Sequence, residues 1–184
     1  MASSHIEEYL NEYNSKAGKN RIPLVLFSGG YDSTLLLLKT LEYTSVDILY
    51  VKGWQAGLKQ LLEMRQRERI IKLVNARTSD YCIRNSYVVK TPFPNSAVAK
   101  KGLYFAGLHQ PVEWLTCAFI AYDPREHNSL LYGAIEGDDA LAHRLEIERM
   151  WHSMVSIRYR YEISTIEMPL NNLSKIQYFY IMRA

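Results

Sequence analysis

The chain has 184 residues, of which 48% are hydrophobic and 22% are charged, a globular composition that excludes wholesale disorder, collagen and coiled coil. Its 22 Lys and Arg against 19 Asp and Glu leave a formal net charge of +3, too small to indicate a nucleic-acid or membrane partner. A chain of this length is expected to form one domain, residues 1–184.

The two cysteines, Cys82 and Cys117, lie far apart and belong to no Cys-x-x-Cys or Cys/His cluster. This spacing argues against a disulfide framework and a structural zinc site, and a reducing compartment fits. The N-terminus has no basic segment followed by an apolar run, and the longest aliphatic stretch, Leu35–Leu38, is too short to span a membrane. We therefore expect a cytoplasmic protein without a membrane partner.

Strand-like and helical patterns alternate along the first half of the chain. The expected elements are a short helix at Ile6–Tyr13, a buried strand at Ile22–Phe27, a helix from Ser33, a strand at Val46–Val51, a helix over Leu58–Val74 and a strand at Tyr81–Lys90. In the long helix, Leu58, Leu61 and Leu62 share the apolar spacing of Ile70, Leu73 and Val74.

The alternation continues after a predicted loop at Thr91–Asn95, which contains two prolines. We expect a deeply buried helix at Pro111–Tyr122, a strand at Ser129–Ile135, a helix with the apolar stripe Ile147, Met150, Trp151 and Met154, a strand at Ile163–Met168, and a last helix that begins at Ser174 with a capping box to Gln177. This order predicts an α/β fold, a doubly wound and mostly parallel sheet with helices on both faces and ligands at the carboxyl ends of its strands.

The most informative segment is Ser28–Ser33, with the sequence Ser-Gly-Gly-Tyr-Asp-Ser, between a hydrophobic strand and a helix. Glycines allow a tight turn, and the N–H groups at a helix start attract anions, so the segment is typical of a phosphate-binding loop. Asp32 would repel phosphates unless a divalent cation lay between them, so we interpret it as a Mg²⁺ ligand or a helix cap. The alternative is an ordinary glycine turn with a serine cap.

Neither the Walker pattern nor the Gly-x-Gly-x-x-Gly pattern of dinucleotide-binding folds is present. The hexapeptide resembles the Ser-Gly-Gly-x-Asp-Ser motif of the N-type ATP pyrophosphatases, which include GMP, NAD and argininosuccinate synthetases, tRNA-thiolating enzymes and 7-cyano-7-deazaguanine synthase. The resemblance implies an adenine nucleotide alpha-hydrolase-like fold. It also implies that ATP is bound by Phe27, Ser28, Gly29, Gly30, Asp32 and Ser33, with Asp32 as a catalytic residue.

Further segments resemble 7-cyano-7-deazaguanine synthase in particular: Tyr50–Gln55, Gly107–His109, Tyr132–Asp139 and Pro169–Lys175. The resemblance implies that Tyr50, Val51 and Gly107 lie at the nucleotide, that Gln55, His109 and Asp138 lie at the substrate, that Asp138 joins Asp32 at Mg²⁺, and that Lys175 is a catalytic cation at the phosphates. The family's four-cysteine tail and its Tyr-Pro-Asp-Cys-Arg segment are absent, so no zinc is expected.

Each of these residues also has an ordinary structural explanation. Lys175 can be a solvated lysine beside a helix cap, and the acidic pair Asp138–Asp139 can stabilise a helix dipole. The histidines, His109 included, share no metal-ligand spacing, and both cysteines can be small core residues. Arg65, Arg67, Arg69 and Lys72 and the segment Arg158–Tyr161 could contact RNA, but a solvated helix face and an exposed strand edge explain them, so nucleic acid is not expected.

The resemblance implies an ATP-dependent ligase that activates a substrate carboxylate as an acyl adenylate, from which ammonia displaces AMP. A deazapurine carboxylate as substrate and a homodimer are further implications of the same resemblance. Two alternatives stay open: a non-catalytic nucleotide-binding or interaction protein that kept the phosphate loop, and a tRNA-modifying ATP pyrophosphatase.

Overall fold

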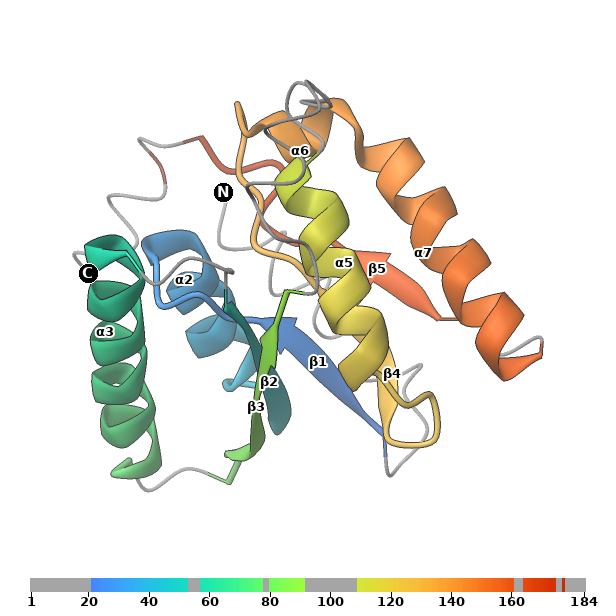
Figure 1. Cartoon of the computed structure of the whole chain (residues 1–184). Helices are drawn as coiled ribbons and strands as arrows, with labels where there is room; N and C mark the ends of the chain where they lie inside the picture. The colour runs from blue at the N-terminus through green and yellow to red at the C-terminus, as the bar shows by residue number, and fades with distance from the viewer. Residues whose placement is uncertain are drawn as a thin grey trace.

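The fold is a five-stranded parallel sheet with strand order β3-β2-β1-β4-β5 (Figure 1). The computed structural model describes residues 21–52, 57–77, 80–91, 109–160, 164–174 and 177. Its elements are β1 (Ile22–Leu26), α2 (Tyr31–Thr40), β2 (Val46–Lys52), α3 (Leu58–Asn75), β3 (Ile83–Lys90), α5 (His109–Ala121), β4 (His127–Leu131), α6 (Asp139–Ala142), α7 (Arg144–Tyr159) and β5 (Thr165–Glu167).

The sheet is covered on both faces, because its central strands alternate their side chains between two hydrophobic cores. Val25 and Phe27 pack with α2 and α3 on one face, whereas Leu24 and Leu26 pack with α5 and α7 on the other. In Figure 1, α2 and α3 accordingly lie on one side of the sheet and α5 and α7 on the other. The predicted doubly wound α/β fold with helices on both faces is confirmed.

The strand order reverses direction at β1. The chain moves outward from β1 through β2 to β3, then returns to the other side of β1 to form β4 and β5. In an open parallel sheet, this reversal leaves a crevice between the carboxyl ends of the two diverging strands, here β1 and β4, and ligands bind there. The fold therefore directs attention to the segments that follow β1 and β4.

The aromatic core anchors α7. Trp151 is fully buried, its ring meets the Tyr122 ring edge to face at 5.1 Å, and its Nε1–H donates to Ser164 Oγ at 3.0 Å. Ile147 and Val155 are buried on the same side of the helix. Ile147 and Trp151 of the predicted apolar stripe are thus confirmed as buried, and Met150 packs at the margin. The last position of the stripe is wrong, because Val155 is buried in place of Met154, which is only half-buried.

Two expectations about helix burial are wrong. Leu58, Leu61 and Leu62 at the start of α3 are 74%, 52% and 55% exposed, because the helix contacts the core only through its later residues, such as Ile70 and Ile71. In α5, Ile120 is 53% exposed, so one side of that helix faces outward. Apolar periodicity identified both helices but not the length of each that the sheet covers.

Two strand expectations are also corrected. The strand predicted at Ser129–Ile135 runs from His127 to Leu131, since the chain then turns across the start of α2. The predicted strand edge at Arg158–Tyr161 is wrong at its start, because Arg158 and Tyr159 form the last turn of α7. Arg160 ends that helix with a left-handed φ of 48°.

The predicted capping box at Ser174 is confirmed by reciprocal bonds. The Ser174 N–H donates to Gln177 Oε1 at 3.0 Å, and the Gln177 N–H donates to Ser174 Oγ at 3.3 Å. The helix expected at Ile6–Tyr13 and most of the loop at Thr91–Asn95 lie outside the described residues. Among the described helices, none is long and apolar enough to cross a membrane.

Candidate nucleotide site

The segment Phe27–Ser33 forms a tight loop at the carboxyl end of the central strand. The Phe27 N–H donates to the Leu49 carbonyl at 2.8 Å, which keeps the end of β1 paired with β2. Gly29 then adopts a φ of +83°, a left-handed conformation that favours glycine. Gly30 is the N-cap of α2 and receives no side-chain cap, so the positive end of this helix faces the loop.

The hydroxyl groups of the loop hold its shape. Ser28 Oγ lies 3.1 Å from Ser33 Oγ and accepts the Gly30 N–H at 3.2 Å. Ser33 Oγ and Thr34 Oγ1 both donate to the Gly30 carbonyl, at 3.2 and 2.7 Å. The loop is therefore pre-formed by its own side chains, and an anion would meet an already ordered cradle.

The segment that follows β4 lies directly against this loop. A Cβ added at Gly133 would be 3.2 Å from the Asp32 carbonyl carbon and oxygen and from the Ser33 nitrogen, so a side chain there would require this backbone to shift by a few tenths of an ångström. Gly133, Asp32 and Ser33 thus lie in contact at the β1–β4 crevice. The crevice at the strand-order reversal is the position that the fold itself favours for a ligand.

Two carboxylates act on one tyrosine in this crevice. Burial raises the pKa of Tyr132, and the negative charges of Asp138 and Asp32 raise it further. Asp138 is the N-cap of α6, and its Oδ2 accepts the Ile135 N–H at 2.9 Å, which uses one of its two carboxylate oxygens. The charges of Asp32 and Asp138 thus act on one side chain, although 106 positions of sequence separate them.

Tyr50 and Val51, predicted at the nucleotide, end the neighbouring strand β2. Tyr50 is 2% exposed, and its hydroxyl donates to Glu63 Oε2 at 3.3 Å. Burial, together with Glu63, raises the pKa of Tyr50 to about 12. Val51 packs on the opposite face of the sheet.

Several predicted site residues are not placed. Gln55, Gly107 and Lys175 lie outside the described residues, and His109 is described only as the first residue of α5, without its side chain. The substrate half of the predicted site therefore rests on Asp138 within the described part of the chain.

The structure also places an acidic residue, Glu167, at the carboxyl end of the sheet, which the sequence analysis did not single out. Glu167 ends β5, next to Leu131 in β4, and accepts the Thr165 hydroxyl at 2.6 Å. Burial raises the pKa of Glu167 to about 7. An acidic residue within a short strand that was expected to be buried is the pattern that could have identified it.

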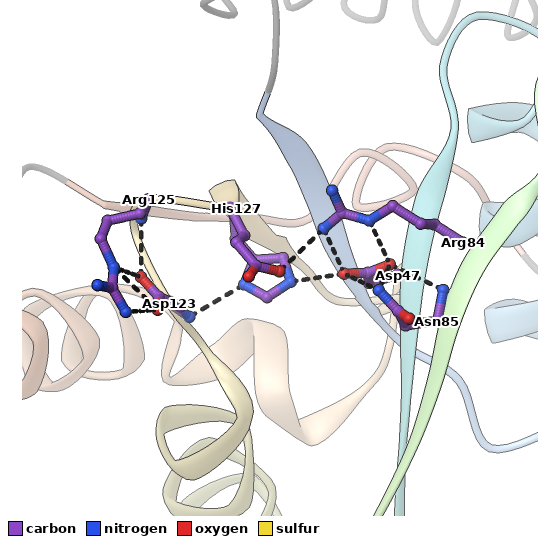
Figure 2. A network of polar contacts seen from close by, with 7 residues as sticks. Asp47, Arg84, Asn85, Asp123, Arg125 and His127 are labelled. Atoms are coloured by element: carbon purple, nitrogen blue, oxygen red, sulfur yellow. Dashed lines mark hydrogen bonds and ion pairs between the residues drawn. The ribbon is translucent and has the colours of Figure 1, made fainter.

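A second polar cluster lies at the opposite, amino-terminal edge of the sheet (Figure 2). Asp47 is fully buried and accepts Arg84 Nε and Nη2 at 3.2 and 2.8 Å, the Asn85 N–H at 2.9 Å and His127 Nε2 at 3.0 Å. Burial alone would raise the pKa of Asp47, but the hydrogen bonds from Arg84, His127 and Asn85 outweigh it, and the pKa lies below its usual value.

Within the described residues, Asp47, Glu126 and His127 are the group whose potential metal-ligand atoms all lie within 4.8 Å of one another. His127 Nδ1 accepts the Asp123 N–H at 3.0 Å, so the ring proton is assigned to Nε2, which donates to Asp47. A metal ion at Nε2 would require loss of that proton, and Arg84 already bridges the Asp47 and Glu126 carboxylates. The cluster is a structural clasp, in which each acceptor has a donor.

Solved structures with the same fold were found, although no family model and no curated protein matches this sequence. They include an NMN synthetase from Francisella tularensis, the U34-tRNA thiolase NcsA from Methanococcus maripaludis with its 4Fe–4S cluster, and an NH3-dependent NAD synthetase from Campylobacter jejuni. Their TM-scores are 0.59, 0.63 and 0.54, at sequence identities of 14%, 13% and 12%.

The similarity extends over 100%, 98% and 100% of this chain and over 70%, 64% and 72% of those three chains. NAD synthetase and tRNA-thiolating enzymes belong to the superfamily whose motif Ser28–Ser33 resembles, whereas a specific similarity to 7-cyano-7-deazaguanine synthase is not among these findings. At such identities the likeness concerns architecture: the chain has the doubly wound, adenine nucleotide alpha-hydrolase-like fold.

Proposed function

We propose that this protein is an ATP-using enzyme of the N-type pyrophosphatase kind, which binds Mg–ATP at Phe27–Ser33 and adenylates a substrate. The observation that carries the proposal is the pre-formed glycine loop at the uncapped start of α2, in the crevice where the strand order reverses. The superfamily motif and three structures of the same fold support it.

In this proposal the residues of the loop bind and orient the nucleotide. Backbone N–H groups in the first turn of α2 and the positive end of that helix hold the pyrophosphate part of ATP, and the paired Ser28 and Ser33 hydroxyls keep the turn in shape. The backbone at the end of β2 receives the adenine. The main contribution of the protein is alignment of a substrate nucleophile with the α-phosphorus.

We assign Mg²⁺ to the carboxylates of Asp32 and Asp138, because hard cations prefer oxygen ligands and both negative charges act on the same tyrosine, Tyr132. Bound there, Mg²⁺ would supply positive charge that offsets the phosphates. Lys175 would add a second cation at the phosphates.

The finer proposal concerns the substrate. A carboxylate oxygen attacks the α-phosphorus, the bond from that phosphorus to the pyrophosphate oxygen breaks, and an acyl adenylate and pyrophosphate form. Ammonia then adds to the acyl carbon and AMP leaves with the former carboxylate oxygen, which gives an amide. The resemblance to 7-cyano-7-deazaguanine synthase favours a deazapurine carboxylate, with Gln55, His109 and Asp138 on the substrate side.

The test is chromatographic quantification of AMP and pyrophosphate from Mg–ATP, with and without 7-carboxy-7-deazaguanine and ammonium. We expect AMP to form, and Asp32→Ala and Ser28→Ala to reduce its formation by about a hundredfold or more while leaving the unfolding transition in place. Glu42→Gln, an exposed acidic position beyond the far end of α2, is the matched control and should retain activity.

Results other than deazapurine-dependent AMP formation would favour one of the alternative functions or refute the site. AMP formation that requires tRNA in place of the deazapurine would favour the tRNA-modifying alternative, whereas ATP that is bound but stays intact under every condition would favour the non-catalytic nucleotide-binding protein. Full activity in both loop variants would refute the site assignment.

A further inference from the structure

One turn of α3 packs directly against the phosphate loop. A Cβ added at Gly29 would lie 3.1 Å from the Arg67 nitrogen, 3.2 Å from Arg67 Cβ and 3.2 Å from the Glu63 carbonyl oxygen. The same turn contacts the end of β2, because the Tyr50 hydroxyl donates to Glu63 Oε2. The Glu63–Arg67 turn therefore touches both the loop proposed for the phosphates and the strand end proposed for the adenine.

Arg67 is a buried cation at this contact. Only 6% of it is exposed, and its guanidinium carbon lies 5.5 Å from the centroid of the Tyr50 ring. Nη2 donates to Ser86 Oγ, whereas Nε, also buried, has no hydrogen-bond partner among the described residues. The neighbouring arginines Arg65 and Arg69 are exposed, so α3 directs this one basic residue inward.

The burial of this charge is not offset by a bonded carboxylate. The ion pairs of the described residues do not include Arg67, and the acidic group that acts on it, Glu68, is exposed. Transfer of a guanidinium from water into a protein interior is unfavourable unless an anion or a full set of acceptors accompanies it. The backbone nitrogen and Cβ of this arginine lie against the phosphate loop, and its guanidinium is held between Tyr50 and Ser86. A buried guanidinium that lacks both an anion and a full set of acceptors is explained if the compensating anion is the ligand.

We propose that Arg67 supplies a fixed positive charge that acts on the phosphates of a nucleotide bound at the Gly29–Gly30 turn. This inference rests on the proposed function, and it adds a residue that neither the motif nor the resemblance assigns. The Tyr50 ring and Ser86 hold the guanidinium in place, so the charge is pre-positioned rather than recruited by the ligand. The proposed action is at a distance, because only the backbone nitrogen and Cβ of Arg67 lie at the loop, whereas its guanidinium bonds Ser86.

A ligand series separates this role from a purely structural one. The dissociation constants of adenosine, AMP and ATP, each with Mg²⁺, are measured by isothermal titration calorimetry for the wild type, Arg67→Met, Arg67→Lys and the matched exposed variant Arg69→Met. If the role of Arg67 is electrostatic, removal of its charge weakens binding in proportion to the negative charge of the ligand. We expect Arg67→Met to weaken ATP about tenfold or more and adenosine less than about twofold, because a charge buried next to the site is poorly screened.

Arg67→Lys keeps the charge and should recover most of the ATP affinity, and Arg69→Met should bind the whole series as the wild type does. Equal weakening of adenosine and ATP in Arg67→Met would overturn the proposal and make Arg67 a packing residue. If Arg67→Met does not fold, the variants Arg67→Lys and Ser86→Ala test the proposal instead. Arg67→Lys keeps the charge, so a loss of ATP affinity in this variant, with unchanged ATP affinity in Ser86→Ala, would contradict a role of the charge. A wild type that binds adenosine and ATP equally also overturns it, and one that binds neither refutes the proposed function itself.

Discussion

Glu167 shows how strongly the surroundings of one residue decide its chemistry. Glu167 is the last residue of β5 and lies beside a buried leucine of β4. Its carboxyl group accepts a short hydrogen bond from the Thr165 hydroxyl. Burial raises its pKa to about 7, whereas the ordinary value is about 4.3. A group of this kind is protonated in the folded protein over a pH range in which the unfolded chain has lost the proton.

Glu167→Gln should therefore change stability in a pH-dependent way. The raised pKa favours the folded wild type below about pH 4.5, and this advantage is lost as the pH rises through about 7, where the buried carboxylate must be ionised. The glutamine variant should match the wild type at low pH and exceed it by about 2 kcal/mol near pH 8 in urea unfolding. Glu136→Gln, at an exposed carboxylate, is the control, and a Glu167→Gln difference that is constant with pH would contradict the explanation.

At the scale of elements, the contact between the end of β4 and the start of α2 lies at the crevice where the strand order reverses. The chain leaves the sheet after Leu131, and Gly133 lies against the backbone of Asp32 and Ser33. The negative charges of Asp32 and Asp138 both act on Tyr132, the residue that follows the end of β4. The contact at Gly133 also explains why the strand is shorter than the predicted Ser129–Ile135: Ala134 and Ile135 pack into the two hydrophobic cores instead of continuing the ladder.

Gly133→Ala tests this contact. The added methyl group would be 3.2 Å from three backbone atoms that cannot rotate away, so the loop or the first turn of α2 must shift. We expect a loss of about 1–2 kcal/mol in the free energy of unfolding, together with weaker ATP binding. Gly57→Ala, where a Cβ meets no atom within 4 Å, is the matched control and should behave nearly as the wild type. Unaltered stability and ATP affinity in Gly133→Ala would mean that the two elements are not tightly apposed.

At the scale of the whole molecule, the two edges of the sheet have different tasks. The carboxyl edge holds the glycine loop and the facing carboxylates, whereas the amino edge is closed by the Asp47 clasp. Asp47 in β2 bonds Arg84 and Asn85 in β3 and His127 in β4, so it joins strands on both sides of β1 (Figure 2). A fully satisfied buried network of this kind favours one arrangement of the strands over others.

Asp47→Asn should be strongly destabilising, by about 3 kcal/mol, because it leaves Arg84 and His127 without their shared anion. Since the pKa of Asp47 is lowered, its contribution is complete above about pH 4 and is lost as the pH falls below the unfolded value, so the variant and the wild type should converge in acid. Chemical denaturation between about pH 3 and 7 measures this. Arg125→Ala, which removes an exposed ion pair with Asp123 in the same figure, should change stability little, and a loss as large as that of Asp47→Asn would refute the distinction.

The sequence by itself determined the features that depend on local chain properties. Alternating apolar periods predicted the order of strands and helices, the Ser28–Ser33 motif predicted a loop at a strand-to-helix junction, and Ser174 with Gln177 predicted a helix cap. Each of these is encoded within a few neighbouring residues, so no knowledge of distant contacts is needed. The single-domain organisation, the ligand roles and the cytoplasmic location stay predictions.

Only the tertiary structure decided which residues of those elements are buried and which meet. The leucines at the start of α3 are exposed and Arg67 on the same helix is inside, because the sheet covers only part of the helix. Helical spacing places Arg67 with Ile70 and Ile71, but nothing local indicates that Gly29 and Tyr50 occupy the space beside it. The joint effect of Asp32 and Asp138 on Tyr132, the buried carboxyl group of Glu167 and the Asp47 clasp likewise depend on strands that are distant in sequence and adjacent in the sheet.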